Sequence, residues 1–388
     1  MDAEMASWKS TGTYVDEVPP PRDNIVDGMW IFRVKRPPGS SPAFKARYDA
    51  RGFIQRHGVD YFQTFSPTPK MTTLWVLLHI AAQRDYELHS LYFRKTFLQG
   101  SLHGEIWPRR PPGFTGTFSA GTQWSLRRPV YGLRQAPRKW HDTLRTALVA
   151  LWFAPSTADP SLFLRTDTSL SPFYVLVYVN DLVFATTHTE ALTLVKSKLQ
   201  KRHTCTDLGP SALWLLVLLA TAHSSLYHPL TRISTFGRVR RAERTSGMGL
   251  VLGGRGPVVI TGHADASRVD DSATQRSSQG YTFSLGSGSV SWRSTRSSLV
   301  LSSSCEAEIY AGAMAAQELR WLTFLLTDLG EQPCLPPILY QGGQLRLAYV
   351  TTRVNTADVF TKALPPSDHQ RFATLLGLVP TLPHLLTD

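Results

Sequence analysis

Cysteines, acidic residues and long apolar stretches are all scarce in this sequence of 388 residues. The three cysteines, Cys205, Cys305 and Cys334, are scattered and odd in number, which argues against a disulfide framework and favours a reducing compartment. The longest apolar run, residues 212–222, is too short to cross a bilayer, so we expect it to pack in a core. The opening residues show no secretory or organellar signal, so we predict a cytoplasmic or nuclear location and no membrane partner.

Basic residues are the feature present in excess. The sequence has 41 Lys and Arg against 29 Asp and Glu, a net charge of +12. This balance predicts a polyanionic partner, nucleic acid before an acidic membrane surface, although a basic protein without such a partner has the same charge. Hydrophobic residues make up 42% of the chain, enough for a sizeable core, and the length suits two or three domains.

Hydrophobic periodicity predicts a mixed α+β fold with two structured regions. Two apolar runs around Asn180 and Asp181 predict a β-hairpin over 173–186 whose turn presents polar groups. We also expect strands at 29–35, 258–264 and 280–292, and helices at 71–84, 189–201 and 304–329. The predicted order is a polar tail or linker (1–25), a first domain (26–222), a short basic and glycine-rich connection (223–256), a second αβ domain (257–364) and a C-terminal tail (365–388).

Several consecutive blocks between about residues 30 and 209 resemble the reverse transcriptases of copia-type retrotransposons in order and spacing. They read KARYDARGFIQRHGVDYFQTFSPTPK (45–70), HSLYFRKTFLQGSLHGEIW (89–107), RPPGF (110–114), YGLRQAPRKWHDTL (131–144), DPSLF (159–163), YVLVYVNDLVFA (174–185) and DLG (207–209). So many separate motifs in one order make this signal specific. The resemblance implies the fingers and palm of a right-hand polymerase.

A second set of blocks is similar to the RNase H domain that follows in the same polyproteins. It comprises HADASRVDDSATQRSSQGYTFSLGSGSVSW (263–292), SSSCEAEIYAGAMAAQELRWL (302–322) and VNTADVFTKALP (354–365). The family's thumb and connection are reduced here to a short stretch between the two sets. The resemblance implies an RNase H-like αβ domain after the palm, which is incomplete because the family's segment that follows residues 338–340 is missing.

The polymerase chemistry that this resemblance implies depends on two Mg²⁺ ions about 4 Å apart, held by converging carboxylates. In the family, one aspartate precedes an F-L-x-G motif and two stand in a Y-V-D-D turn. Here the first position is Tyr92 and the turn reads Tyr178-Val179-Asn180-Asp181, so Asp181 is the remaining carboxylate. A protonated phenol and a neutral amide replace two charges, and Arg94 and Lys95 would repel a cation further. We predict no meaningful DNA synthesis.

Five other positions match residues that the family uses to bind nucleotide and template. Phe97 matches an aromatic residue under the incoming sugar, although a core phenylalanine fits the pattern too. Lys45 and Arg47 would meet the triphosphate, unless they form a solvated basic strand edge. Gln135 and Arg138 match the motif that packs against nucleotide and template. The implied ligands are an RNA or DNA template–primer and a deoxynucleoside triphosphate.

The RNase H resemblance implies a second two-metal site built from four acidic residues. Asp265, Glu308 and Asp358 match three of them, whereas Glu306 is expected on a solvated face. The remaining aspartate normally follows a strand written like Ile338-Leu339-Tyr340, but here the chain runs directly into residues 341–343. We therefore expect no strand cleavage. The sequence favours an inactive relative that still binds nucleic acid over an active enzyme, and it leaves open a pseudogene product without a role.

Overall fold

The computed structural model shows an α+β protein, as the sequence predicts. It describes residues 1–19, 24–36, 41–102, 106–114, 121–210, 248–254, 257–271, 274–286, 288–332, 354–362 and 364–380. The predicted core run at 212–222, the basic connection at 223–247, Cys334 and residues 338–343 lie outside these ranges. Among the described residues, none forms a helix long and apolar enough to cross a membrane.

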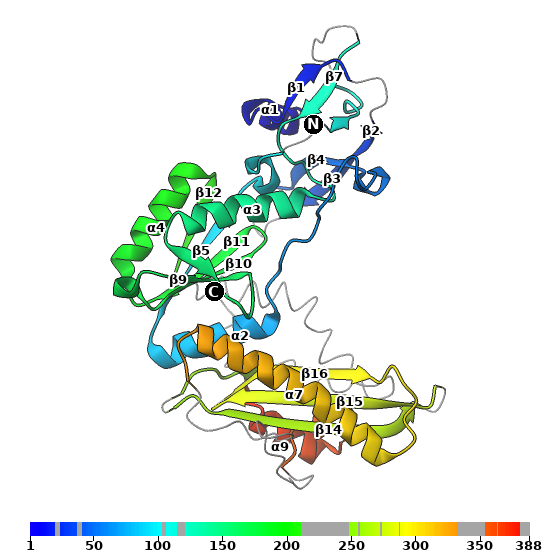
Figure 1. Ribbon diagram of the computed structural model, residues 1–388, viewed down its shortest axis with the longest axis vertical. Helices are drawn as coiled ribbons and strands as arrows, with labels where there is room; N and C mark the ends of the chain where they lie inside the picture. The colour runs from blue at the N-terminus through cyan, green and yellow to red at the C-terminus, as the bar shows by residue number, and fades with distance from the viewer. Residues whose placement is uncertain are drawn as a thin grey trace.

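The centre of the molecule is an antiparallel sheet whose middle strands come from distant parts of the sequence (Figure 1). In spatial order its strands are β12 (Cys205–Pro210), β5 (Glu87–Phe93), β11 (Asp181–Thr186), β10 (Phe173–Tyr178), β9 (Leu162–Arg165) and β8 (Phe153–Pro155). β10 and β11 form the predicted hairpin, joined by two residues. β5 pairs along the whole of β11, so the strand that ends in Tyr92 and Phe93 lies beside the hairpin turn.

Both faces of the central sheet are apolar because successive side chains in a strand point to opposite sides. Val175 and Phe184 belong to one buried cluster with residues of α3 and α4, whereas Leu176 and Val183 belong to another with residues of α2. The helices are α2 (Met71–Arg84), α3 (Ala136–Val149) and α4 (Thr189–Arg202). The helices expected at 71–84 and 189–201 are confirmed.

The N-terminal part of the molecule is built from short strand pairs. β3 (Gly28–Lys35), which matches the strand expected at 29–35, pairs with β4 (Ala43–Ala50). The remaining elements are α1 (Asp2–Ser10), β1 (Tyr14–Glu17) with β7 (Gln123–Leu126), β2 (Ile25–Val26) with β6 (Trp107–Pro108), and the short 3-10 helices Gly52–Ile54, Thr96–Gln99 and Thr168–Leu170.

The prediction of a polar tail at residues 1–25 is wrong for most of that range. Trp8 of α1 is 1% exposed, and its ring lies 6.0 Å from that of Tyr48 and 6.1 Å from that of Trp124. Burial of this large side chain, with Met5 packed on the same cluster, docks a helix that has few apolar residues, which is why hydrophobic periodicity did not reveal it.

The C-terminal part contains a three-stranded antiparallel sheet covered by one long helix (Figure 1). Its elements are β14 (Ile260–Asp271), β15 (Arg276–Leu285), β16 (Gly288–Arg296), α7 (Ser304–Asp328), α8 (Asp358–Thr361), α9 (Pro366–Leu375), and the pair β13 (Met248–Leu250) and β17 (Leu378–Pro380). The segment expected as one strand at 280–292 is instead parts of β15 and β16, which turn back at Gly286. The predicted tail at 365–388 is wrong for α9 and β17.

One helix joins the central sheet to the C-terminal sheet. α2 lies between them, and its side chains share a buried cluster with both, including Val183 from the central sheet and Leu322 from α7 (Figure 1). Polar contacts fasten the same junction: the Tyr174 hydroxyl donates to the Leu329 carbonyl at 2.7 Å, and Arg84 pairs with Glu331 at 2.8 Å. The apolar core therefore runs continuously from the central sheet into the C-terminal part.

Candidate active site

The turn between β10 and β11 places the polar residues of the predicted site at the edge of the central sheet. Val179 has a left-handed backbone (φ 54°) that an L-residue with a branched side chain rarely adopts. Two hydrogen bonds hold the turn: Trp140 Nε1 donates to the Val179 carbonyl at 2.7 Å, and the Phe93 amide donates to the Asn180 carbonyl at 2.8 Å. Helix α3 and strand β5 thus fix where Asn180 and Asp181 lie.

Tyr92 lies directly opposite Asp181 in the antiparallel ladder of β5 and β11. Residues opposite one another in such a ladder project to the same face with their Cβ atoms about 5 Å apart. The structure therefore brings together the positions that the sequence singled out, Tyr92, Asn180 and Asp181. The Tyr92 side chain is 38% exposed, so a phenol borders the open side of this site.

Asp181 is a largely desolvated acid with no compensating charge. Burial raises its pKa to about 7, and its Oδ1 atom has no hydrogen-bond partner among the described residues. A carboxyl group in such surroundings holds its proton near neutral pH because desolvation disfavours the charged form.

These residues do not fit a pair of Mg²⁺ ions. Mg²⁺ needs several oxygen ligands with negative charge among them, and this site offers one carboxylate, one amide and one phenol. No group of three or more His, Cys, Asp or Glu residues suited to a metal ion occurs within the described ranges. The neighbouring Arg94 and Lys95 are exposed and add positive charge at the end of β5.

A cluster of aromatic and basic side chains connects the N-terminal part to this site. Arg47 on β4 stacks over the Tyr131 ring at 4.4 Å, and the Phe97 ring contacts Tyr131 edge-on at 4.9 Å between centroids. Arg47 also binds both oxygens of Asp49, at 2.6 and 2.8 Å. Burial raises the pKa of Tyr131, Arg47 lowers it, and nearby Tyr92 raises it further.

Tyr131 is a member of this cluster that the sequence analysis missed. Its position depends on Gly132, whose φ of 87° and close approach to β4 exclude any side chain: an added Cβ would lie 2.0 Å from the Ala50 carbonyl oxygen. The Ala50 amide also donates to the Tyr131 carbonyl at 2.8 Å. The glycine within the YGLRQAP block was the available signal, because it marks a backbone approach that carries Tyr131 onto β4.

The other three residues predicted to bind nucleotide or template have different surroundings. Lys45 is exposed on β4, two residues from Arg47 and so on the same face of the strand. Gln135 is 4% exposed, and its amide accepts from Gln55 at 3.1 Å and donates to the Asp60 carbonyl at 3.0 Å. Arg138 pairs with Asp142 at 2.9 Å. Lys45 is open to a ligand, whereas Gln135 ties the start of α3 to the N-terminal part.

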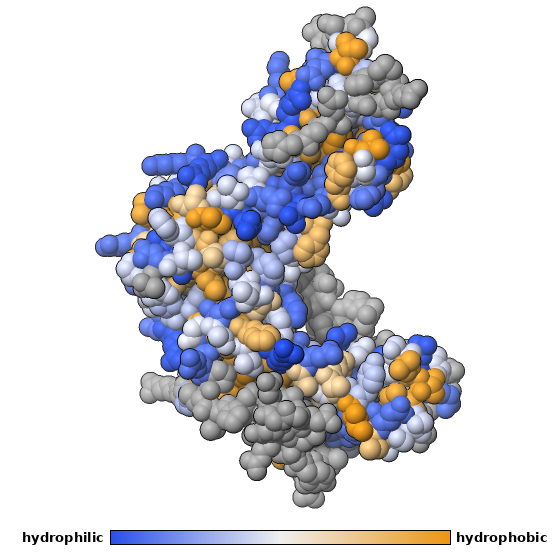
Figure 2. All heavy atoms as spheres, in the orientation of Figure 1, coloured by the Kyte–Doolittle hydropathy of each residue, from blue (hydrophilic) through white to orange (hydrophobic). Residues whose placement is uncertain are grey.

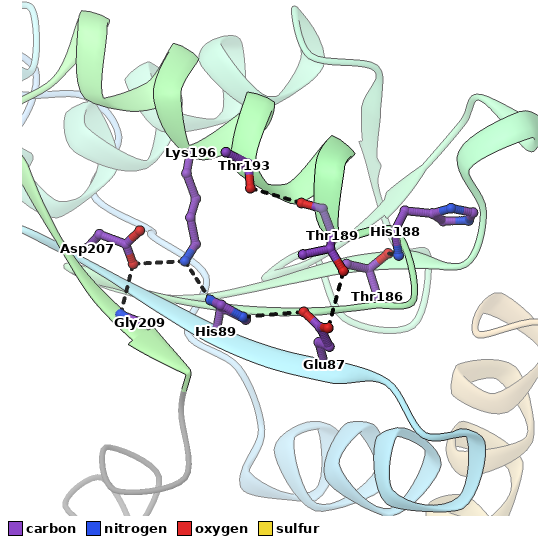
Figure 3. A network of polar contacts seen from close by, with 9 residues as sticks. All are labelled: Glu87, His89, Thr186, His188, Thr189, Thr193, Lys196, Asp207 and Gly209. Atoms are coloured by element: carbon purple, nitrogen blue, oxygen red, sulfur yellow. Dashed lines mark hydrogen bonds and ion pairs between the residues drawn. The ribbon is translucent and has the colours of Figure 1, made fainter.

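A polar network around one buried lysine secures the other end of β5 (Figure 3). Lys196 of α4 is 5% exposed; its Nζ lies 2.7 Å from His89 Nδ1 and donates to Asp207 Oδ1 at 2.8 Å. Burial lowers the pKa of His89, and the Lys196 ammonium lowers it further. The network links α4, β5 and β12, and so fixes the strand that carries Tyr92.

In the C-terminal part, three predicted acidic residues lie around one lysine. Asp265 of β14 and Asp358 of α8 are 3% and 2% exposed, and both bind Lys362, at 3.0 and 3.1 Å. Glu308 of α7 lies close to them: burial of its carboxyl group raises its pKa, and the charge on Asp265 raises it further. Glu306 is exposed at the start of α7, as predicted, where it accepts from the Ser302 amide at 2.7 Å.

Comparison with known families agrees with this arrangement. Residues 13–227, more than half of the chain, match the reverse transcriptase (RNA-dependent DNA polymerase) family, so the chain belongs to that family. Within it the chain is of the copia retrotransposon Pol type, because its relatives are Pol polyproteins of such transposons.

Two plant relatives show the extent of the similarity. The chain is 29% identical to the retrovirus-related Pol polyprotein from transposon RE2 of Arabidopsis thaliana, over 94% of this chain and 33% of the relative. It is 24% identical to the polyprotein from transposon TNT 1-94 of Nicotiana tabacum, over 85% of this chain and 31% of the relative. The chain thus spans about a third of these relatives.

Among solved structures, the foamy viral protease-reverse transcriptase in complex with an RNA/DNA hybrid superimposes with a TM-score of 0.45 at 12% identity. That alignment covers 97% of this chain and 52% of the viral chain.

Proposed function

We propose that this chain is a copia-type reverse transcriptase region that binds template–primer nucleic acid and does not synthesise DNA. One observation carries the proposal: Tyr92 and Asp181 are opposite each other in the ladder, with Asn180 in the adjoining turn. The position where two metal ions would be held therefore has one carboxylate. The +12 net charge favours retained binding of a polyanion.

The loss of charge is large enough to abolish synthesis. Mg²⁺, when bound at such a site, activates the primer hydroxyl and neutralises the leaving pyrophosphate. Replacement of two carboxylates by neutral groups removes several kcal/mol of cation binding at a partly buried site, and each ~1.4 kcal/mol is a tenfold change in rate. Burial raises the pKa of Asp181 to about 7 and so disfavours the charged form that would bind a cation.

The β3–β4 hairpin supports binding of a nucleic acid strand. Phe32 is 65% exposed and Phe44 is 84% exposed on one face of the hairpin, and the paired residues Arg33 and Lys45 are exposed on its other face. Figure 2 shows hydrophobic and hydrophilic side chains intermixed over this N-terminal part. Exposed aromatic rings suit the stacking of bases, and exposed cations on the same hairpin suit pairing with phosphates.

For the C-terminal part we propose an RNase H-like domain without strand-cleaving activity. The convergence of Asp265, Glu308 and Asp358 supports the resemblance, because these residues come from three separate elements. The lysine that binds two of them argues against cleavage.

A primer-extension assay tests the proposed loss of synthesis. The full chain is compared with the Tyr92→Asp, Asn180→Asp double variant on a poly(rA)–oligo(dT) template–primer, with Mg²⁺ and then Mn²⁺. We expect no extension by the native chain, and a gain of at least about a hundredfold over background in the double variant if two restored charges recover ~3 kcal/mol. Extension by the native chain that Asp181→Asn abolishes would contradict the proposal.

Salt dependence tests the proposed binding separately. Fluorescence anisotropy with a labelled RNA/DNA duplex should show an affinity that falls linearly with the logarithm of salt concentration, because neutralised phosphates release counterions. Lys45→Met should reduce the slope by about one and weaken binding without regard to sequence. Lys201→Met, a matched change on exposed α4, is the control, and an affinity that does not change with salt would exclude this mode of binding.

A further inference from the structure

Two buried carboxylates in the C-terminal part share a single ammonium group. Lys362 Nζ lies 3.0 Å from Asp265 Oδ1 and 3.1 Å from Asp358 Oδ1. The two acidic side chains are 5% and 3% exposed, whereas the lysine side chain is 35% exposed. Ionised carboxylates removed from water need a compensating charge, and Lys362 supplies one to both.

The second oxygen of Asp265 is also engaged. It accepts a hydrogen bond from the Thr361 hydroxyl, so the residue next to Lys362 completes the coordination of the same carboxylate. The Asp265 oxygen atoms that could bind a metal ion thus already accept hydrogen bonds from Lys362 and Thr361.

The segment that carries this lysine is fastened to the sheet at several points. Asn355 Nδ2 donates to the Ala264 carbonyl at 3.2 Å, and Ser294 Oγ donates to the Phe360 carbonyl at 2.8 Å. An added Cβ at Gly280 would lie 2.9 Å from Phe360 Cβ, so α8 packs closely on β15. These contacts place Lys362 between the two carboxylates as part of the fold.

We propose that Lys362 is the resident cation of this carboxylate cluster and keeps divalent metal ions out of it. The residues do not fit a metal ion while the lysine binds both aspartates, because an ammonium and a divalent cation compete for the same oxygens. The C-terminal part then folds without metal, and removal of the ammonium frees the oxygens of Asp265 and Asp358 for a cation. This inference rests on contacts within the C-terminal part and stands whether or not the chain extends a primer.

Mn²⁺ binding to the full chain tests the proposal, followed by electron paramagnetic resonance and by thermal unfolding with and without metal. The native chain should bind no Mn²⁺ that depends on Asp265, and its Tm should not change with Mg²⁺ or Mn²⁺. Lys362→Met should have a lower Tm without metal, and should gain one Mn²⁺ per chain together with a metal-dependent rise in Tm. Lys198→Met, a matched change on an exposed lysine of α4, should gain neither.

Two further variants keep the outcome decisive. Lys362→Arg retains the positive charge and should behave like the native chain, and Lys362→Met combined with Asp265→Asn should lose the gained Mn²⁺. The proposal is overturned if the native chain binds Mn²⁺ in a way that Asp265→Asn abolishes. It is equally overturned if Lys362→Met folds without gaining a metal ion, or if it stays unfolded at every metal concentration.

Discussion

Asp181 is the residue whose surroundings most clearly govern both chemistry and stability. Its carboxyl group lies opposite Tyr92 in the ladder, and no cation forms an ion pair with it within the described part of the site. An acid with a raised pKa favours the folded state only while it is protonated, since the unfolded chain ionises at the ordinary value near 3.8. Folding therefore becomes less favourable as pH rises from about 4 to 7, and above 7 the cost is complete.

Asp181→Asn should remove this pH-dependent cost. We expect the variant to exceed the native chain in stability by about 1–2 kcal/mol at pH 8 and to match it at pH 4, a gain smaller than the full pKa shift implies because the side chain is partly exposed. Urea unfolding at both pH values measures the difference. Asp85→Asn is the control on an exposed turn, and an equal effect of pH on both variants would refute the assignment.

Some residues of the candidate sites could be predicted from the sequence, and others could not. Tyr92, Asn180 and Asp181 could be placed together in advance, because the resemblance to copia-type reverse transcriptases implies that these motifs share one site. Tyr131 and Lys362 were missed although both stand inside the quoted blocks. The role of Tyr131 depends on the close approach of Gly132 to β4, and the role of Lys362 depends on the contact of α8 with β14. These are tertiary contacts, and hydrophobic periodicity in the sequence does not indicate them.

Strand β5 borders the candidate active site and is held in position at both of its ends. Its Tyr92 end meets the hairpin turn, while its other end is fastened through His89 to Lys196 and Asp207 (Figure 3). Because the Lys196 ammonium is buried and shared, it connects α4, β5 and β12 at a single point.

Lys196→Met should loosen this connection. Loss of the ammonium takes one partner from each of Asp207 and His89, which keep the Gly209 amide and Glu87, and we expect the free energy of unfolding to fall by about 1–3 kcal/mol. The pKa of His89 should rise in the variant, because one of the groups that lowers it has gone; NMR titration of the histidine measures this directly. Lys198→Met changes an exposed lysine of the same helix and should alter neither quantity, so a similar loss in both variants would argue against the network.

Elements with local signals were predictable and those that depend on distant contacts were not. The hairpin, α2 and α7 carry long apolar patterns, and the observed bounds agree with the predicted ones. The strand expected at 280–292 failed because alternation continues through the turn at Gly286, so β15 and β16 read as one run. Helix α1 was missed because it has few apolar residues, and Trp8, packed against Tyr48 and Trp124, is its main buried side chain.

On the scale of the whole molecule, the central sheet and the C-terminal part share one core rather than touching as separate domains. Leucines of α7, residues of α2 and the second face of the central sheet belong to the same buried cluster. The sequence places a domain boundary in the connection at 223–256, and composition supports that boundary along the chain. The sequence does not reveal that α2, far earlier in the chain, packs against the C-terminal sheet.

A shared core predicts that damage to α7 is transmitted to the central sheet. Leu322 is fully buried in this cluster, so Leu322→Ala should lower the free energy of unfolding by about 2–5 kcal/mol. Hydrogen exchange should then accelerate in α2 and β10 as well as in α7, because these elements open together as one cooperative unit. Phe324→Ala removes a larger side chain from the same helix, but that side chain is 51% exposed, and the change should leave exchange in α2 untouched. Faster exchange confined to α7 in the Leu322 variant would show that the two sheets unfold independently despite the continuous packing.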